Sequence, residues 1–158
     1  MAATDSSAMA TSGREIVITR VFDAPRELVF EAWTDPEQVV QWWGPGGFTT
    51  TIHEMDVQTG GVWRFVMHSP DGTDYDNKVV FVEVARPERL VYDHGPGDES
   101  DSPQFRVTVT FDEEGDTTRL TLKLVFESPA ERDNAVESGA LEGGNQTLER
   151  LGEYLAKA

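Results

Sequence analysis

The chain of 158 residues contains no cysteine. This absence excludes a disulfide framework, thiol catalysis, iron–sulfur clusters and zinc sites built from thiolates. Basic side chains are also scarce, because 13 lysines and arginines face 29 aspartates and glutamates, which gives a formal charge of −16. A surface this acidic repels phosphate backbones and anionic lipids, so we expect neither nucleic acid nor a membrane as a partner.

Long apolar runs are missing as well. No stretch approaches the ~20 apolar residues that a membrane-spanning helix needs. Residues 1–13 are small and polar, without the basic start and apolar stretch of a signal peptide. We therefore expect a cytoplasmic protein in which residues 1–13 form a flexible tail and residues 14–158 form a single domain.

The first part of the predicted domain combines one strand with two short helices. Residues 15–22 (EIVITRVF) are rich in β-branched residues, which favours a strand. Pro25 then presets the first turn of a helix over residues 26–33. The sequence Thr34-Asp35-Pro36-Glu37 repeats this start signal for a second short helix, which ends before the glycine-rich residues 44–47.

From residue 48 onward the apolar period changes to two, which is typical of strands. Short turns separate the segments, so we expect an antiparallel meander with one face apolar and the other exposed to water. The six predicted strands are 48–57, 61–69, 77–85, 89–94, 104–111 and 117–126.

A long C-terminal helix is expected to cover the apolar face of this sheet. Ser128-Pro129-Ala130-Glu131 has the pattern of a capping box with proline at the first helical position. Leu141, Leu148, Leu151 and Leu155 then form one apolar stripe. The predicted fold is therefore α+β, with a strongly bent seven-stranded sheet around one long helix.

The order of motifs resembles the START-like superfamily, also called helix-grip or SRPBCC. The resemblance is greatest to its bacterial branch named after the activator of the ninety-kilodalton heat-shock protein's ATPase. It covers residues 16–155 and is carried by RVFDAP (20–25), AWTDPE (32–37), WWGP (42–45), GGVWRF (60–65), PDG (70–72) and PERLV (87–91).

The resemblance implies a deep apolar cavity between the concave face of the sheet and the C-terminal helix. It does not imply one function, because members of the superfamily include ligand carriers, cyclase-like enzymes and chaperone cofactors. The sequence also departs from the family pattern. Gln58 replaces a common arginine, and Gly144-Asn145 replaces a frequent Gly-Trp, so a ligand preference cannot be transferred.

Strand alternation directs Trp63, Phe65 and Met67 toward the concave side, where they either line the cavity or fill the core. Asn145 lies on the apolar stripe of the last helix and needs a hydrogen-bond partner there, which could be a ligand, a water molecule or another protein group. The candidate ligand-binding residues are Trp43, His53, Met55, Trp63, Phe65, Met67, Tyr92, Phe105, Leu122, Asn145 and Leu148.

The three histidines have no metal-binding spacing, and the sequence contains no motif for a phosphate-bearing or dinucleotide cofactor. We therefore expect no metal and no cofactor. His53 alternates with Met55 and is expected to face inward, whereas His68 and His94 lie beside predicted turns and are expected at the surface. Glu83 is either a buried carboxylate near Tyr92 or a surface charge.

These features lead to one main hypothesis and two alternatives. The main hypothesis is a protein that binds a small apolar or aromatic molecule and is non-enzymatic or at most weakly catalytic, with no catalytic residue assigned. The first alternative is a co-chaperone in which the acidic surface contacts a chaperone of the Hsp90 type. The second is an enzyme resembling cyclases or dehydratases, with His53, Tyr92 or Glu83 as the acid or base.

Overall fold

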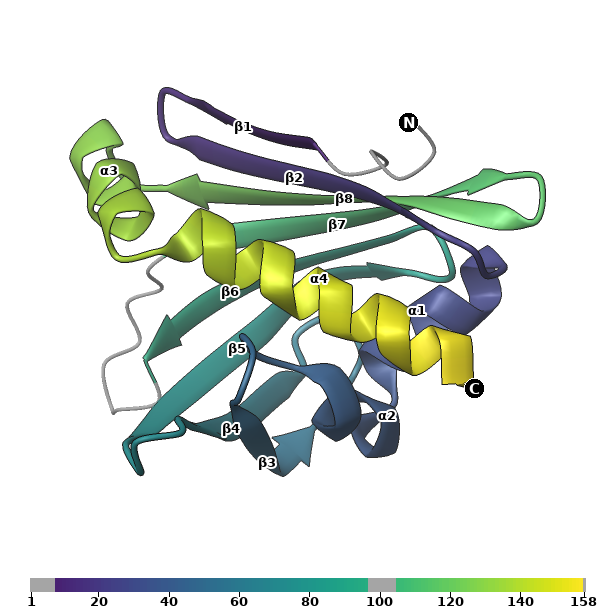
Figure 1. The fold of residues 1–158 in the computed structure, drawn as a ribbon, viewed down its shortest axis with the longest axis horizontal. Helices are drawn as coiled ribbons and strands as arrows, with labels where there is room; N and C mark the ends of the chain where they lie inside the picture. Colours follow the sequence, from purple (N-terminus) through teal and green to yellow (C-terminus); the bar gives the residue numbers. More distant parts are fainter. Residues whose placement is uncertain (1–7, 97–104, 158) are drawn as a thin grey trace.

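A computed structural model describes residues 8–96 and 105–157 of the chain. The α+β prediction is confirmed, since helices pack on one face of an antiparallel sheet (Figure 1). The elements are β1 (Ala8–Ser12), β2 (Glu15–Phe22), α1 (Arg26–Thr34), α2 (Pro36–Trp42), β3 (Thr49–Met55), β4 (Val62–His68), β5 (Asp74–Ala85), β6 (Arg89–Pro96), β7 (Phe105–Glu114), β8 (Thr117–Phe126), α3 (Pro129–Glu137) and α4 (Ala140–Lys157).

The sheet has eight strands in the order β1-β2-β8-β7-β6-β5-β4-β3. Helix α4 runs diagonally across its face, and α1 and α2 pack at the end of the sheet near the C-terminus of α4 (Figure 1). Gly144 allows α4 to approach β2 closely, because a Cβ atom at this position would lie 2.7 Å from Cδ1 of Ile18. About one and two turns further along α4, Leu148 and Leu151 are fully buried.

The prediction of a tail over residues 1–13 is wrong in its second half. Ala8–Ser12 forms strand β1, which pairs with β2 and adds the eighth strand to the sheet. The two strands are joined at Gly13, whose φ of +57° at the first central position of a two-residue turn favours a tight hairpin. Residues 1–7 of the predicted tail lie outside the described residues.

The single C-terminal helix of the prediction is in fact two helices. The N-cap of the predicted capping box is confirmed, since the backbone N–H of Glu131 donates to Oγ of Ser128 at 3.2 Å. However, Gly139 has a φ of +92°, which ends α3 and starts α4 in a new direction. Helix α3 has no buried residue, whereas the apolar stripe of α4 packs on the sheet.

All four tryptophans of the chain form one aromatic cluster with Phe65. Trp33, Trp42 and Trp43 come from α1, α2 and the residue after α2, with ring centroids 5.0–5.7 Å apart. Trp43 reaches Trp63 on β4 at 4.8 Å, and Trp63 stacks on Phe65 at 4.4 Å. This cluster attaches the two short helices to the sheet and fills the concave side near β4.

We expect Gly61→Ala to destabilise the fold by roughly 1–3 kcal/mol, because it forces atoms together in a packed turn. A Cβ atom at Gly61 would overlap the backbone carbonyl oxygen of Asp56, which cannot move away like a side chain. Chemical denaturation would measure the change.

The matched control for this substitution is Gly152→Ala in α4. A Cβ atom there meets Phe22 at 3.5 Å, an ordinary contact, and alanine favours a helix by up to about 1 kcal/mol over glycine. A Gly61→Ala variant as stable as the control would contradict our account of this turn.

Candidate functional site

A cavity of about 430 Å³ lies between the concave face of β6–β8 and the segment where α3 meets α4. Its described lining is almost entirely apolar, and no aspartate, glutamate, lysine or arginine of residues 8–96 and 105–157 belongs to it. The lining residues are Trp33, Trp43, Gly44, Pro45, Met67, Tyr92, His94, Phe105, Val107, Leu122, Leu124, Ala135, Ser138, Gly139, Ala140, Gly143, Gly144, Thr147 and Leu148.

Six of the eleven residues predicted as ligand contacts line this cavity. They come from the loop after α2, four strands and α4, so the fold brings together residues that are distant in the sequence. The six are Trp43, Met67, Tyr92, Phe105, Leu122 and Leu148.

Trp63 and Phe65 point toward the concave side as strand alternation predicted, but they do not line the cavity. Each is 1% exposed. Trp43 packs against both rings, at 4.8 and 5.9 Å between centroids, and itself lines the cavity. The sequence left open whether the two residues fill the core or line a cavity, and in the structure they fill the core.

The inward orientation predicted for His53 is wrong. Ile52 pairs with Phe65 and Glu54 with the next residue, Arg64, so His53 is an extra residue in a β-bulge of β3. The bulge breaks the alternation of side chains, and His53 is exposed to solvent. Met55, which pairs with Trp63, packs partly buried against the core and does not line the cavity.

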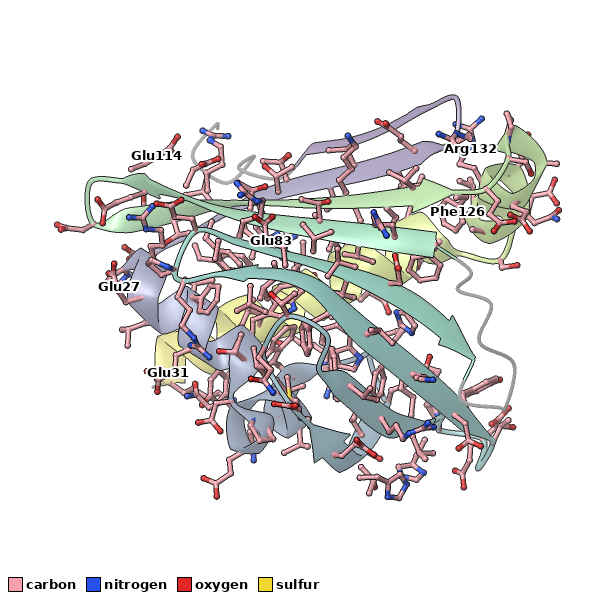
Figure 2. The ribbon with its side chains drawn as sticks, turned by 180° about the vertical axis from the view of Figure 1, so that it is seen from behind. Glu27, Glu31, Glu83, Glu114, Phe126 and Arg132 are labelled. Atoms are coloured by element: carbon pink, nitrogen blue, oxygen red, sulfur yellow. The ribbon has the colours of Figure 1, made fainter. Side chains whose placement is uncertain are left out.

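Two other candidate polar residues have partners outside the cavity. Asn145 accepts a hydrogen bond at 2.9 Å from Nη2 of Arg20 on β2. Glu83 forms a two-point ion pair with Arg89 at 2.8 and 3.0 Å, on the sheet face opposite α4 (Figure 2). The hydrogen bond from Arg89 lowers the pKa of Glu83, which favours a structural surface charge over a proton donor.

His94, which was expected at the surface, lines the cavity instead. Its ring packs 4.9 Å from that of Phe105 and 5.9 Å from that of Phe65. Burial lowers the pKa of His94 to about 4, so the imidazole is neutral at pH 7. The signal for this position was present in the sequence, because His94 follows Tyr92 by two residues and therefore shares its face of the strand.

The hydrogen bonds around His94 fix which ring nitrogen carries the proton. Nδ2 of Asn77 donates to the carbonyl oxygen of Tyr75 at 3.0 Å, so Oδ1 of Asn77 is the atom that faces His94. Oδ1 lies 2.8 Å from Nε2 of His94 and can only accept. Nε2 therefore carries the proton, and Nδ1 is a hydrogen-bond acceptor.

Side chains from α4 form hydrogen bonds with the loop between α2 and β3, which lies at the edge of the cavity. Nη1 of Arg150 donates to the carbonyl oxygens of Gly44 and Pro45 at 2.9 and 3.0 Å. Oε1 of Gln146 accepts from the backbone N–H of Gly46 at 3.1 Å. Since Gly44 and Pro45 line the cavity, these bonds set the position of one side of it.

Within residues 8–96 and 105–157, no cluster of three or more histidine, aspartate or glutamate side chains could hold a metal ion. The same part of the chain has no helix long and apolar enough to cross a bilayer.

An α+β sheet wrapped around a C-terminal helix, with a cavity between them, defines a helix-grip protein of the START-like superfamily. Residues 23–156 match the family described as Activator of Hsp90 ATPase homolog 1-like protein. The chain belongs to this family.

Solved structures with the same fold come from several bacteria. The solution structure of an Arthrobacter aurescens protein is 27% identical, with a TM-score of 0.88 over 96% of this chain and 92% of that one. A Mycobacterium smegmatis protein is 24% identical, with a TM-score of 0.86 over 96% of both chains. The AHSA1 protein of Silicibacter pomeroyi is 24% identical, with a TM-score of 0.74 over 90% of this chain and 97% of that one. No curated protein matches the chain.

Burial of neutral His94 predicts that the protein loses stability as the pH falls from about 6.5 to about 4. The folded pKa is about 4 and the ordinary value is 6.5, so protons bind the unfolded chain first in this interval. At 1.36 kcal/mol per pKa unit, the loss is at most about 3 kcal/mol, while stability above pH 6.5 is unaffected by this group.

Comparison of wild type with His94→Phe by urea unfolding at several pH values isolates this effect. The substitution also changes the stability at neutral pH, because Oδ1 of Asn77 loses its hydrogen bond to His94. The change of stability with pH is therefore the quantity to compare. Equal slopes between pH 6.5 and pH 5 would show that His94 is not held neutral by burial.

Proposed function

We propose that this protein binds a small, uncharged, largely apolar molecule in the cavity between β6–β8 and α4. The observation that supports this most directly is that none of the described residues lining the cavity is charged, in a chain whose formal charge is −16. The cavity volume of about 430 Å³ lies within the range of small-molecule sites in proteins.

The energetics of such binding follow from the apolar area. A ligand that removes about 300 Å² of apolar surface from water would gain roughly 7–8 kcal/mol before the costs of ordering. Since micromolar affinity corresponds to about 8 kcal/mol, apolar contacts alone predict weak binding, and polar contacts must add to it. An engineered cavity of about 150 Å³ accommodates benzene, so 430 Å³ has room for roughly two or three rings.

The neutral fluorescent probe N-phenyl-1-naphthylamine tests this proposal. We expect its emission to rise and saturate with a Kd in the micromolar to submillimolar range. Leu122→Trp, which adds bulk inside the cavity, should weaken binding at least tenfold. No saturable signal with wild-type protein would contradict the proposal.

Thr121→Trp provides the matched control, because Thr121 lies on the opposite face of β8 from Leu122. Its affinity for the probe should stay within about twofold of wild type. Equal losses in the two variants would indicate that the probe binds elsewhere or that the added tryptophan disturbs the fold.

The structure supports the enzyme hypothesis less well. Two of its three candidate acids or bases lie outside the cavity: His53 is exposed on the bulge and Glu83 is paired with Arg89. Tyr92 does line the cavity, but burial raises the pKa of its phenol, which makes it a weaker acid.

The family description supports a second candidate, a cofactor of an Hsp90-type chaperone that would use the acidic surface. Such a contact would be dominated by exposed charges, so we expect it to weaken as salt screens them. Titration with a bacterial Hsp90 at 20 mM and 300 mM salt, with ATPase activity as a second readout, tests this. No binding and no change in ATPase activity at low salt would exclude it.

A further inference from the structure

Two polar side chains stand side by side on the sheet side of the cavity, whereas the polar lining residues Ser138 and Thr147 lie on the helical side. Tyr92 and His94 are two residues apart on β6, so both point into the cavity from the same face of the strand. Their Cα atoms are therefore separated by roughly 7 Å. A ligand group placed between the two side chains could reach both.

Tyr92 provides a hydrogen-bond donor. Within the described residues, its hydroxyl group donates to no protein acceptor. The buried indole N–H of Trp33 faces this hydroxyl group, although the two atoms do not form a hydrogen bond of ordinary geometry. Because the indole N–H can only donate, it favours an orientation in which the Tyr92 oxygen accepts and the Tyr92 proton points elsewhere.

His94 provides the complementary acceptor. Asn77 fixes the proton on Nε2, and Nδ1 has no hydrogen-bond partner among the residues that the structure describes. An imidazole without charge can accept a hydrogen bond at Nδ1 but cannot offer a cation to an anionic ligand there.

The described surroundings of this pair disfavour charged ligands. None of the described lining residues carries a charge that could balance a carboxylate, phosphate or ammonium group. Burying an unpaired charge is strongly unfavourable. A hydroxyl group is the simplest neutral group that accepts one hydrogen bond and donates another from a single atom.

We infer that the ligand is a neutral ring compound bearing a hydroxyl group, whose oxygen accepts a hydrogen bond from Tyr92 and whose proton is donated to Nδ1 of His94. Trp33 is a positioning residue that holds the Tyr92 hydroxyl in place. This inference rests on the proposed function, because it names the class of ligand that the same cavity takes.

Three probes of similar size separate the contributions: naphthalene, 2-naphthol and 2-methoxynaphthalene. All three present the same two rings, which the cavity volume can accommodate, but only 2-naphthol can both accept and donate. Kd values for the three would be measured at pH 7 by competition with N-phenyl-1-naphthylamine, and confirmed by NMR shifts.

We expect 2-naphthol to bind about tenfold more tightly than naphthalene, since each hydrogen bond adds roughly twofold to tenfold. The methyl ether, which can accept but not donate, should fall between them. In Tyr92→Phe and in His94→Phe, the ratio of naphthol to naphthalene affinity should move toward one. The methyl ether accepts from Tyr92 but donates nothing to His94. Tyr92→Phe should therefore reduce its affinity relative to naphthalene, and His94→Phe should not.

Trp33→Phe tests the positioning role. This substitution should lower the preference for 2-naphthol over naphthalene, whereas a purely structural role would weaken the two probes by the same factor. Melting temperatures of the variants show whether they are folded.

The outcomes distinguish this inference from the proposal on which it rests. Equal affinities for naphthalene and 2-naphthol would overturn the inference and leave an apolar ligand site. A preference for 2-naphthol that persists in both Tyr92→Phe and His94→Phe would also overturn it. If the wild-type protein binds neither these probes nor N-phenyl-1-naphthylamine, the proposed function and this inference both fail.

Discussion

The packing of four tryptophans and Phe65 determines where this domain is solid and where it is hollow. These rings attach α1 and α2 to the sheet and fill the concave side near β4. The space left over lies farther along the sheet, against β6–β8, where α4 begins with small residues such as Gly143 and Gly144. Large rings at one end and glycines at the other therefore place the cavity asymmetrically under the helix.

Most of the fold could be predicted from the sequence because its signals are local. Alternation in β7 and β8, the N-cap at Ser128 and the apolar stripe of α4 each depend on neighbouring residues alone. The hairpin at Gly13 and the break at Gly139 were missed. In both cases glycine adopts a positive φ, which a sequence permits at any glycine but does not require.

The candidate site was only partly predictable, because it depends on depth and register as well as on alternation. Alternation correctly predicted that Trp63 points inward, but it could not predict that Trp43 packs against Trp63 and separates it from the cavity. One bulge in β3 reversed the expected orientation of His53. His94 was misassigned because a turn was expected directly after it, whereas β6 continues to Pro96 and keeps the ring inside.

The bulge at His53 also affects the outer rim of the sheet. β3 is the last strand on its side, so its outer backbone groups could template the addition of a strand from another molecule. An extra residue bends such an edge and interrupts the regular spacing of its hydrogen-bonding groups. The irregularity that turns His53 outward thus makes this edge a poorer template for self-association and fibre-like growth.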